Sequence, residues 1–214
     1  MKKIVILVLG LLGGMNSLSS QSNPVAETKK YVNLGEALRS PKEVITLDLS
    51  NQKINLDDID WSLFSNLEYL SLKNDNLTVI PEGLSKLSNL KTLDLSGNNF
   101  KVLPKTLKSL SKLQVLYLND EKQFDLEKSM DVLSNLTNLK ELHLENDKLQ
   151  ALPKQLDKMK SLELLYLNDN DFMELPKQIM QLDHLRLLDF KNNNVNANLQ
   201  EMKNLNFGFK LILE

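Results

Sequence analysis

Three side chains able to bind a metal or move a proton, Glu141, His143 and Glu145, occupy alternate positions of one short segment. On a β-strand alternate residues point to the same side, so all three would share one surface. Imidazole and carboxylates can bind a divalent metal ion. Successive outward residues lie ~6.6 Å apart, however, which is wide for three ligands of one ion. We therefore expect no metal site and no cofactor, but a solvated, mildly acidic face.

The rest of the sequence offers little for catalysis. It contains two His and no Cys, which excludes a cysteine nucleophile, a thiolate metal site and a disulfide scaffold. The motifs of serine hydrolases, zinc proteases and phosphate-binding loops do not occur. His184 precedes a predicted strand, where a solvated turn residue is the usual case. The sequence therefore predicts a protein that is not an enzyme.

Composition limits the other function classes. The 214 residues are 42% hydrophobic and 25% charged, enough to bury a core, and Leu and Asn account for 48 and 24 of them. The formal net charge of −2 argues against nucleic-acid binding, which needs a basic surface to displace phosphate counterions. The Leu and Asn excess requires a specific structural explanation.

The first residues have the order of a secretory signal peptide. Lys2 and Lys3 precede an apolar run over residues 4–12, which small and polar residues follow. The run is about half the length of a membrane-spanning helix, so we expect no span once the signal, residues 1–20, is removed. The predicted protein is exported, and is periplasmic, surface-associated or secreted. The lack of Cys favours a bacterial source.

A repeated pattern organises most of the chain. Each copy has an apolar residue, then Leu three positions later, then Leu or Phe after two more, and a polar ninth residue. Successive copies begin 23, 23, 23, 26, 23 and 23 residues apart, which is too regular for chance. The seven copies, numbered here as repeats one to seven, begin at Val44, Leu67, Leu90, Leu113, Leu139, Leu162 and Leu185.

Side-chain periodicity converts this pattern into a structure. The fourth and sixth positions, such as Leu47 and Leu49, lie on one side of a strand, whereas the third, fifth and seventh positions point outward. A single repeat cannot bury its Leu residues, but a stack of repeats can. In four repeats a Pro follows the return turn and disfavours helix before it, which predicts short 3₁₀ or extended segments opposite the strands.

This pattern resembles the leucine-rich repeat family, in its 23-residue form with Leu-Pro on the convex side. The resemblance covers about residues 44–205 and implies an α/β solenoid with a parallel sheet on its concave face. It also implies a ladder of hydrogen bonds from Asn at the ninth position. Ionised Asp and Glu accept hydrogen bonds but cannot donate them, so we expect a weaker ladder in repeats two, four and five. The ninth positions hold Gln52, Asp75, Asn98, Glu121, Asp147, Asn170 and Asn193.

Repeat four and the two ends depart from the pattern. Repeat four has three extra residues, and its segment 124–134 has the apolar spacing of a short helix, which is either a functional bulge or simple length drift. Asn33 and Glu36 have N-cap spacing, so we expect a capping helix in a linker and cap region, residues 21–43. The repeats then cover residues 44–206. Alternating apolar residues predict a terminal capping strand within 207–214.

The outward positions of repeats four to seven contain side chains that core packing does not require. Tyr117, His143 and Tyr166 form a predicted aromatic row. Exposed aromatic clusters favour protein interfaces, although aromatic residues also suit strands and can simply cover one another. The candidate partner-binding residues are Tyr69, Val115, Tyr117, Glu141, His143, Glu145, Leu164, Tyr166, Leu187 and Asp189.

These observations predict a non-enzymatic, monomeric protein–protein recognition module. It binds its partner through the concave sheet face. The alternative is a carbohydrate- or host-surface-binding adhesin, because Tyr rings and carboxylates also suit sugars.

Overall fold

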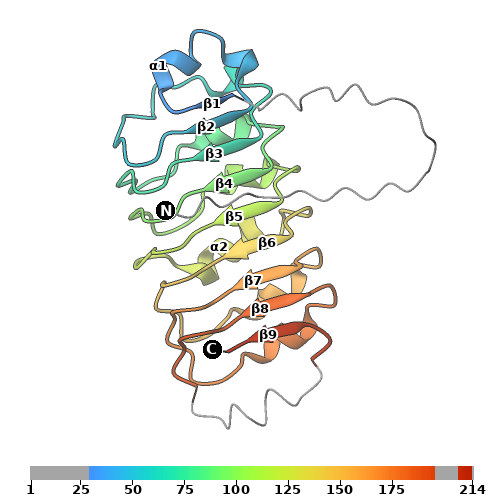
Figure 1. Cartoon of the computed structure of the whole chain (residues 1–214). Helices are drawn as coiled ribbons and strands as arrows, with labels where there is room; N and C mark the ends of the chain where they lie inside the picture. The colour runs from blue at the N-terminus through green and yellow to red at the C-terminus, as the bar shows by residue number, and fades with distance from the viewer. Residues whose placement is uncertain (1–28, 196–206, 214) are drawn as a thin grey trace, which may run out of the picture.

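A computed structural model describes residues 29–195 and 207–213. Its nine strands form one parallel sheet in sequence order, seen as a stack of arrows in Figure 1. The predicted signal peptide, residues 1–20, lies outside the described residues. The strands are β1 (Lys30–Tyr31), β2 (Thr46–Asp48), β3 (Tyr69–Ser71), β4 (Thr92–Asp94), β5 (Val115–Tyr117), β6 (Glu141–His143), β7 (Leu164–Tyr166), β8 (Leu187–Asp189) and β9 (Lys210–Ile212).

Short helical segments line the opposite, convex side of the stack (Figure 1). Pro81, Pro104, Pro153 and Pro176 each immediately precede a 3₁₀ segment, where a residue without a backbone N–H leaves no donor unsatisfied. The prediction of short 3₁₀ segments opposite a parallel sheet is confirmed. The segments are α1 (Leu34–Ala37), η1 (Pro41–Glu43), η2 (Trp61–Leu63), η3 (Glu82–Lys86), η4 (Lys105–Ser109), α2 (Leu126–Leu133), η5 (Lys154–Lys158) and η6 (Lys177–Gln181).

The core is a single Leu layer between the sheet and these segments. The fourth and sixth positions of the repeats are buried throughout, and Leu47, Leu49, Leu93 and Leu95 have no exposed surface. Corresponding positions pair along the sheet, as Leu70 does with Leu93. Each repeat therefore buries its Leu residues against those of its neighbours, as the spacing predicts.

The extra residues of repeat four form α2 on the convex side. The carboxylate of Asp125 caps the helix by accepting from Lys128 N at 3.0 Å. Leu126, Met130 and Leu133 are buried, and α2 stacks on η4. The Ser129 hydroxyl also accepts from Leu103 N at 3.2 Å. The insertion thus lengthens the convex arc and adds core, and it adds nothing to the concave face.

At the first end of the stack, the Asn33 side chain accepts from Glu36 N at 3.0 Å and caps α1, as its spacing predicts. At the other end, β9 pairs with β8 and places Leu211 beside Leu188. No helix among the described residues has the length and apolarity that a membrane crossing needs.

The turn after each strand accounts for four of the 24 Asn residues. The eighth position of every repeat has positive φ, a conformation that Gly, Asn and Asp tolerate best. Several of these side chains also bond across repeats, as Asn74 Nδ2 does to Asn51 Oδ1 at 3.1 Å. The repeat pattern of Leu residues did not predict this second row. Its members are Asn51, Asn74, Gly97, Asp120, Asn146, Asp169 and Asn192.

The ninth position forms the buried ladder. Asn98 accepts from Asp75 N and Leu77 N through Oδ1 and donates through Nδ2 to the carbonyls of Leu72 and Leu95. Its amide therefore both accepts hydrogen bonds from the backbone of repeat two and donates one to it.

The side chains at the acidic ninth positions accept hydrogen bonds from the preceding repeat but donate none in return. Asp75, Glu121 and Asp147 each accept backbone N–H groups of the preceding repeat. The second carboxyl oxygen of each is buried and has no hydrogen-bond partner among the described residues. The predicted difference between Asn and acid repeats therefore appears as lost donation to the backbone carbonyls.

Candidate functional site

The aromatic row lies on three adjacent strands of the concave face. Register pairs Tyr117 with His143 and His143 with Tyr166, so β5, β6 and β7 bring the three rings side by side. The imidazole centroid is 4.1 Å from each phenol centroid, with interplanar angles of 25° to Tyr117 and 5° to Tyr166. The three rings therefore form one continuous stack.

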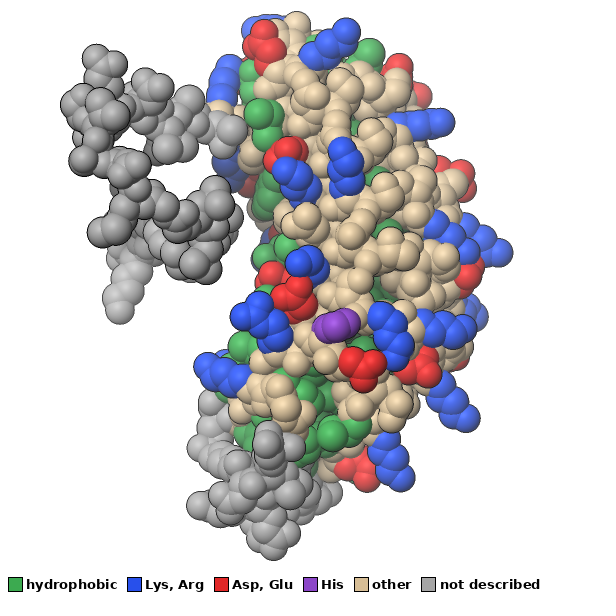
Figure 2. Space-filling view, turned by 90° about the vertical axis from the view of Figure 1, so that its right-hand side faces the viewer, with side chains coloured by type: hydrophobic (Ala, Val, Ile, Leu, Met, Phe, Trp, Pro, Cys, Tyr) green, Lys and Arg blue, Asp and Glu red, His purple; other side chains and the backbone are tan. Residues whose placement is uncertain are grey.

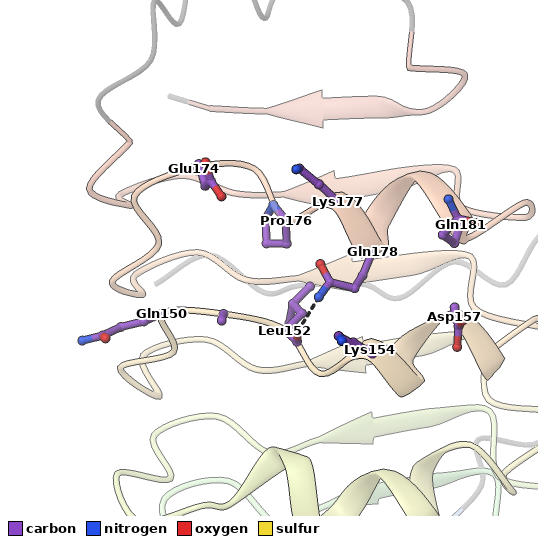
Figure 3. Close-up of a pocket in the computed structure, with 10 residues that line it drawn as sticks. Gln150, Leu152, Lys154, Asp157, Glu174, Pro176, Lys177, Gln178 and Gln181 are labelled. Atoms are coloured by element: carbon purple, nitrogen blue, oxygen red, sulfur yellow. Dashed lines mark hydrogen bonds between the residues drawn. The ribbon is translucent and has the colours of Figure 1, made fainter.

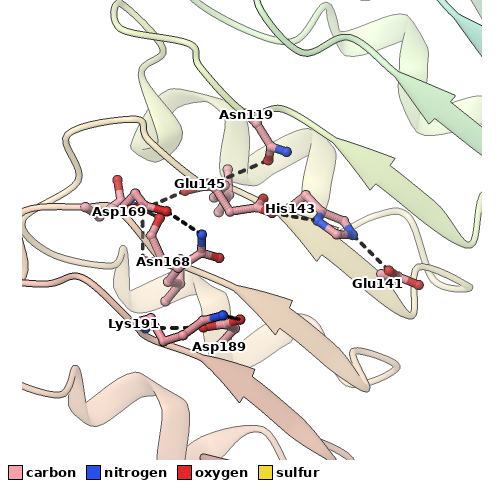
Figure 4. A network of polar contacts seen from close by, with 11 residues as sticks. Asn119, Glu141, His143, Glu145, Asn168, Asp169, Asp189 and Lys191 are labelled. Carbon is pink, nitrogen blue, oxygen red and sulfur yellow. Dashed lines mark hydrogen bonds and ion pairs between the residues drawn. The ribbon is translucent and has the colours of Figure 1, made fainter. Parts of the chain in front are cut away.

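Two carboxylates fix the central ring. His143 Nε2 lies 2.8 Å from Glu141 Oε1, and Nδ1 lies 3.1 Å from Glu145 Oε1 (Figure 4). Burial lowers the pKa of His143, but the hydrogen bonds and charges of the two Glu residues outweigh it, so the net pKa is raised. The geometry therefore favours an imidazolium held between two carboxylates and two aromatic faces.

This arrangement changes the expected chemistry of the Glu-His-Glu segment. A solvated face was expected, but His143 is only 8% exposed because the Tyr rings cover both of its faces. Both ring nitrogens are already hydrogen-bonded, and no group of His, Asp and Glu in the described part of the chain is arranged to hold a metal ion. His143 acts as the rigid centre of the stack, while the Tyr and Glu side chains form the surface.

The two phenols remain protonated. Burial raises the pKa of Tyr117 to about 12, with further contributions from the negative charges of Glu141 and Asp94. Burial and the nearby carboxylates also raise the pKa of Tyr166. At neutral pH both hydroxyls are therefore available to donate hydrogen bonds.

Acidic residues lie at both ends of the aromatic row. Asp94 on β4 pairs in register with Tyr117, and Asp189 on β8 pairs with Tyr166. Asp189 forms an ion pair with Lys191 at 3.1 Å (Figure 4). Asp94 accepts from Ser96 N at 3.0 Å and forms no ion pair with any described residue. The charge of Asp189 at one end of the row is therefore compensated by a Lys, whereas the charge of Asp94 at the other end is not compensated by any described residue.

The structure brings most of the predicted site residues together. Val115, Glu141, Leu164 and Leu187 pair successively across β5 to β8 and form a half-buried row beside the aromatic one. Glu145 lies two residues after the end of β6. Tyr69 is the exception, because β4, with Thr92 and Asp94, separates it from Tyr117 and its neighbours.

A groove on the convex side was not predicted from the sequence. It lies between η5 and η6 and encloses about 590 Å³. Gln178 crosses it and donates to the carbonyl of Leu152 at 2.7 Å (Figure 3). Exposed Met173 and Met180 belong to the same repeat as η6.

Comparison with known proteins identifies the fold. Residues 37–143 match the family described as a leucine-rich repeat region. The chain belongs to the leucine-rich repeat proteins. Leucine-rich repeat proteins stack short repeats into an arc whose concave side serves as an extended binding surface, and they are typically recognition proteins rather than enzymes. This family assignment agrees with the fold and the family that the repeat spacing predicts.

Two bacterial structures are similar to this leucine-rich repeat protein. A leucine-rich repeat protein of Leptospira interrogans is 31% identical with a TM-score of 0.62, over 82% of this chain and 50% of that one. Internalin C2 of Listeria monocytogenes is 25% identical with a TM-score of 0.57, over 75% of this chain and 66% of that one. The chain thus spans half the length of the first protein and 66% of the second. No curated protein matches it.

Proposed function

We propose that this leucine-rich repeat protein is an exported, non-enzymatic recognition module that binds a protein partner through the concave face of repeats four to seven. The observation that carries the proposal is the stacked row of Tyr117, His143 and Tyr166. Glu141 and Glu145 fix its central ring. A row held in this way presents a large surface that loses little conformational entropy on binding.

The size of the face limits the affinity. Six spacings of ~4.8 Å between seven strands, and five consecutive residues at ~3.3 Å along each strand, give on the order of 500 Å². A standard interface buries about 800 Å² on each partner. We therefore expect modest affinity for a folded partner, and the half-buried Leu164 and Leu187 add apolar area beside the rings.

The test compares wild type with a double variant, Tyr117→Ala with Tyr166→Ala, in crosslinking within the native envelope. A matched control, Met173→Ala with Met180→Ala, removes two exposed side chains from another surface. We expect partners held by the wild type and the control to be lost from the Tyr variant, with all three proteins folded by circular dichroism. Retention of every partner by the Tyr variant would refute the concave-face proposal.

Export is tested separately by sequencing the N-terminus of the mature protein. A start close to Gln21 is the expected result, and an intact Met1 in the extracytoplasmic fraction contradicts a cleaved signal.

The alternative, a carbohydrate- or host-surface-binding adhesin, has less support. Sugars stack on open aromatic faces, and because His143 covers the inner faces of Tyr117 and Tyr166, only one face of each ring remains for a sugar. Hits for the purified protein on a glycan array, lost in the same Tyr variant, would favour this alternative.

A further inference from the structure

The outward-facing residues of the central strands have an unbalanced charge. The third and fifth positions of β4 to β7 include two carboxylates and no Lys or Arg. The seventh positions that follow these strands add Glu145 and no cation. Elsewhere on the face, Lys30 compensates Asp48 at 2.7 Å and Lys191 compensates Asp189 at 3.1 Å. Positive charges of the chain itself therefore neutralise the ends of the face but leave its centre acidic.

The central histidine cannot balance this charge. His143 as an imidazolium carries one positive charge and is hydrogen-bonded to both Glu141 and Glu145. Together with Asp94, the group then keeps a formal charge of about −2. The Glu141 side chain is 24% exposed, so its charge is accessible to a partner. Glu145 is 20% exposed, but its Oε2 is buried, so it contributes to the potential rather than to direct contact.

The ring face of Tyr117 that His143 does not cover is turned toward this acidic centre. One side of the ring stacks on His143, and the neighbour in register on its other side is Asp94. Glu141 on the next strand also acts on the phenol, since both carboxylates contribute to its raised pKa of about 12. An aromatic face beside carboxylates suits a guanidinium, which can stack on the ring and bond to a carboxylate with the same planar group.

The lateral surface differs from this centre. On the side shown in Figure 2, Lys and Arg side chains are interspersed with Asp and Glu. Glu163, for example, pairs with both Lys140 at 2.9 Å and Arg186 at 3.2 Å. Such exposed pairs are already satisfied and attract charged partners weakly.

Building on the proposed function, we propose that the occupant of the concave face is a basic, Arg-containing segment of a protein partner, with an Arg side chain seated on the Asp94 side of the Tyr117 ring, where the charges of Asp94 and Glu141 both act. Val115 and Leu164 flank Glu141 in register and contact the aliphatic part of the same segment. An acidic peptide or polyanion is repelled by the same centre.

The experiment measures binding of three labelled peptides to the full chain by fluorescence anisotropy: tetra-arginine, tetra-citrulline and tetra-glutamate. Citrulline keeps the planar shape of Arg and removes its charge. We expect tetra-arginine to bind at least about 10-fold tighter than the other two peptides, and raising NaCl from about 50 to 500 mM to weaken its binding. Equal binding of arginine and citrulline peptides, or no binding of either, would overturn the proposal.

Matched variants separate a defined site from bulk charge. Asp94→Asn with Glu141→Gln removes two charges while keeping the oxygens that accept from Ser96 N and His143. Asp157→Asn with Asp183→Asn removes two charges from exposed positions elsewhere. We expect about a 10-fold loss of tetra-arginine affinity in the first variant and less than about 2-fold in the second. Equal losses mean bulk attraction only and contradict the site.

The same variants distinguish this inference from the proposed function. If the Asp94→Asn, Glu141→Gln protein retains a natural partner that the Tyr117→Ala, Tyr166→Ala protein loses, the face binds protein but not through a basic segment. If both proteins retain every partner, the concave-face function itself fails.

Discussion

Repeats three and four pair their strands in register but differ in the ladder residue and in the residue that the fifth position places on the concave face. Repeat three places Asn98 in the buried ladder and Asp94 on the concave face, whereas repeat four places Glu121 and Tyr117 there. Asn98 both accepts and donates hydrogen bonds, whereas Glu121 leaves a buried carboxyl oxygen without a hydrogen-bond partner among the described residues. Repeats four and five thus combine an acidic ladder residue with Tyr117 and the Glu-His-Glu segment. Tyr166 lies in repeat six, whose Asn170 keeps the full ladder.

Protonation of the ladder carboxyl group can restore part of the hydrogen-bond donation that repeats four and five lack. Burial raises the pKa of Glu121 to about 8 and that of Asp147 to about 8, and neighbouring carboxylates contribute. Near neutral pH both groups are therefore largely protonated. A protonated carboxyl group has one donor and one acceptor, which is close to the hydrogen-bonding capacity of the Asn amide. Repeats four and five then resemble the Asn repeats only while Glu121 and Asp147 hold their protons.

The largest expected effect comes from breaking a regular repeat. Asn98→Ala leaves the carbonyls of Leu72 and Leu95 and two backbone N–H groups without their partner. We expect the free energy of unfolding to fall by about 3 kcal/mol in urea titration, because these groups are buried. The adjacent exposed Asn99→Ala is the control, with a loss below about 0.5 kcal/mol. Similar losses in the two variants would mean that the ladder is not a major source of stability.

The pH dependence of stability tests the protonated acids. Their folded-state pKa values of about 8 exceed unfolded values of ~4, so stability is full below pH ~4 and falls as the pH rises toward 8. His143, whose pKa is also raised, contributes in the same direction as it loses its proton. Between pH 5 and 8 we expect a loss on the order of 3 kcal/mol. A flat or rising unfolding free energy over this range contradicts protonation of the ladder.

Converting an acid repeat into a regular one gives a smaller effect. Asp147→Asn restores a donor that does not depend on pH, so the variant should be more stable than wild type by about 1–2 kcal/mol at pH 8 and nearly equal at pH 5. Thermal unfolding at both pH values measures the difference. Asp157→Asn, an exposed change of the same kind, should leave both values unaltered. An equal gain in stability at the two pH values would mean that the effect does not come from the protonation of Asp147.

The smallest effect concerns the exposed turn. Asn146 has a φ of 58° and donates to Asp120 Oδ1 at 2.6 Å. Asn146→Ala should cost about 1 kcal/mol through backbone strain. Asn146→Gly loses the same hydrogen bond but suits positive φ, so its cost should stay below about 0.5 kcal/mol. Chemical denaturation of the pair separates strain from hydrogen bonding, and equal losses would exclude strain as the cause.

Features set by the repeat period could be predicted from the sequence. The Leu positions, the strands, the convex 3₁₀ segments, the cap at Asn33 and the helix after Phe124 all follow from side-chain spacing within the chain. The spacing also brought Tyr117, His143 and Tyr166 onto one face, as the register shows.

Features set by distances between repeats could not be predicted in the same way. The burial of His143 depends on the 4.1 Å ring spacing to both neighbours, and the raised pKa of Asp147 depends on desolvation inside the stack. The positive φ at position eight left a trace in the recurring Asn, Asp and Gly. This recurrence indicates positive φ only once the turn geometry is known.

Hydrogen–deuterium exchange of the full chain, alone and with a captured partner, tests the central claim most directly. The account predicts added protection over residues 115–117, 141–145, 164–166 and 187–189, which include β5 to β8, with little change in α2, η5 and η6. Protection confined to the convex segments, with β5 to β8 unchanged, would contradict it.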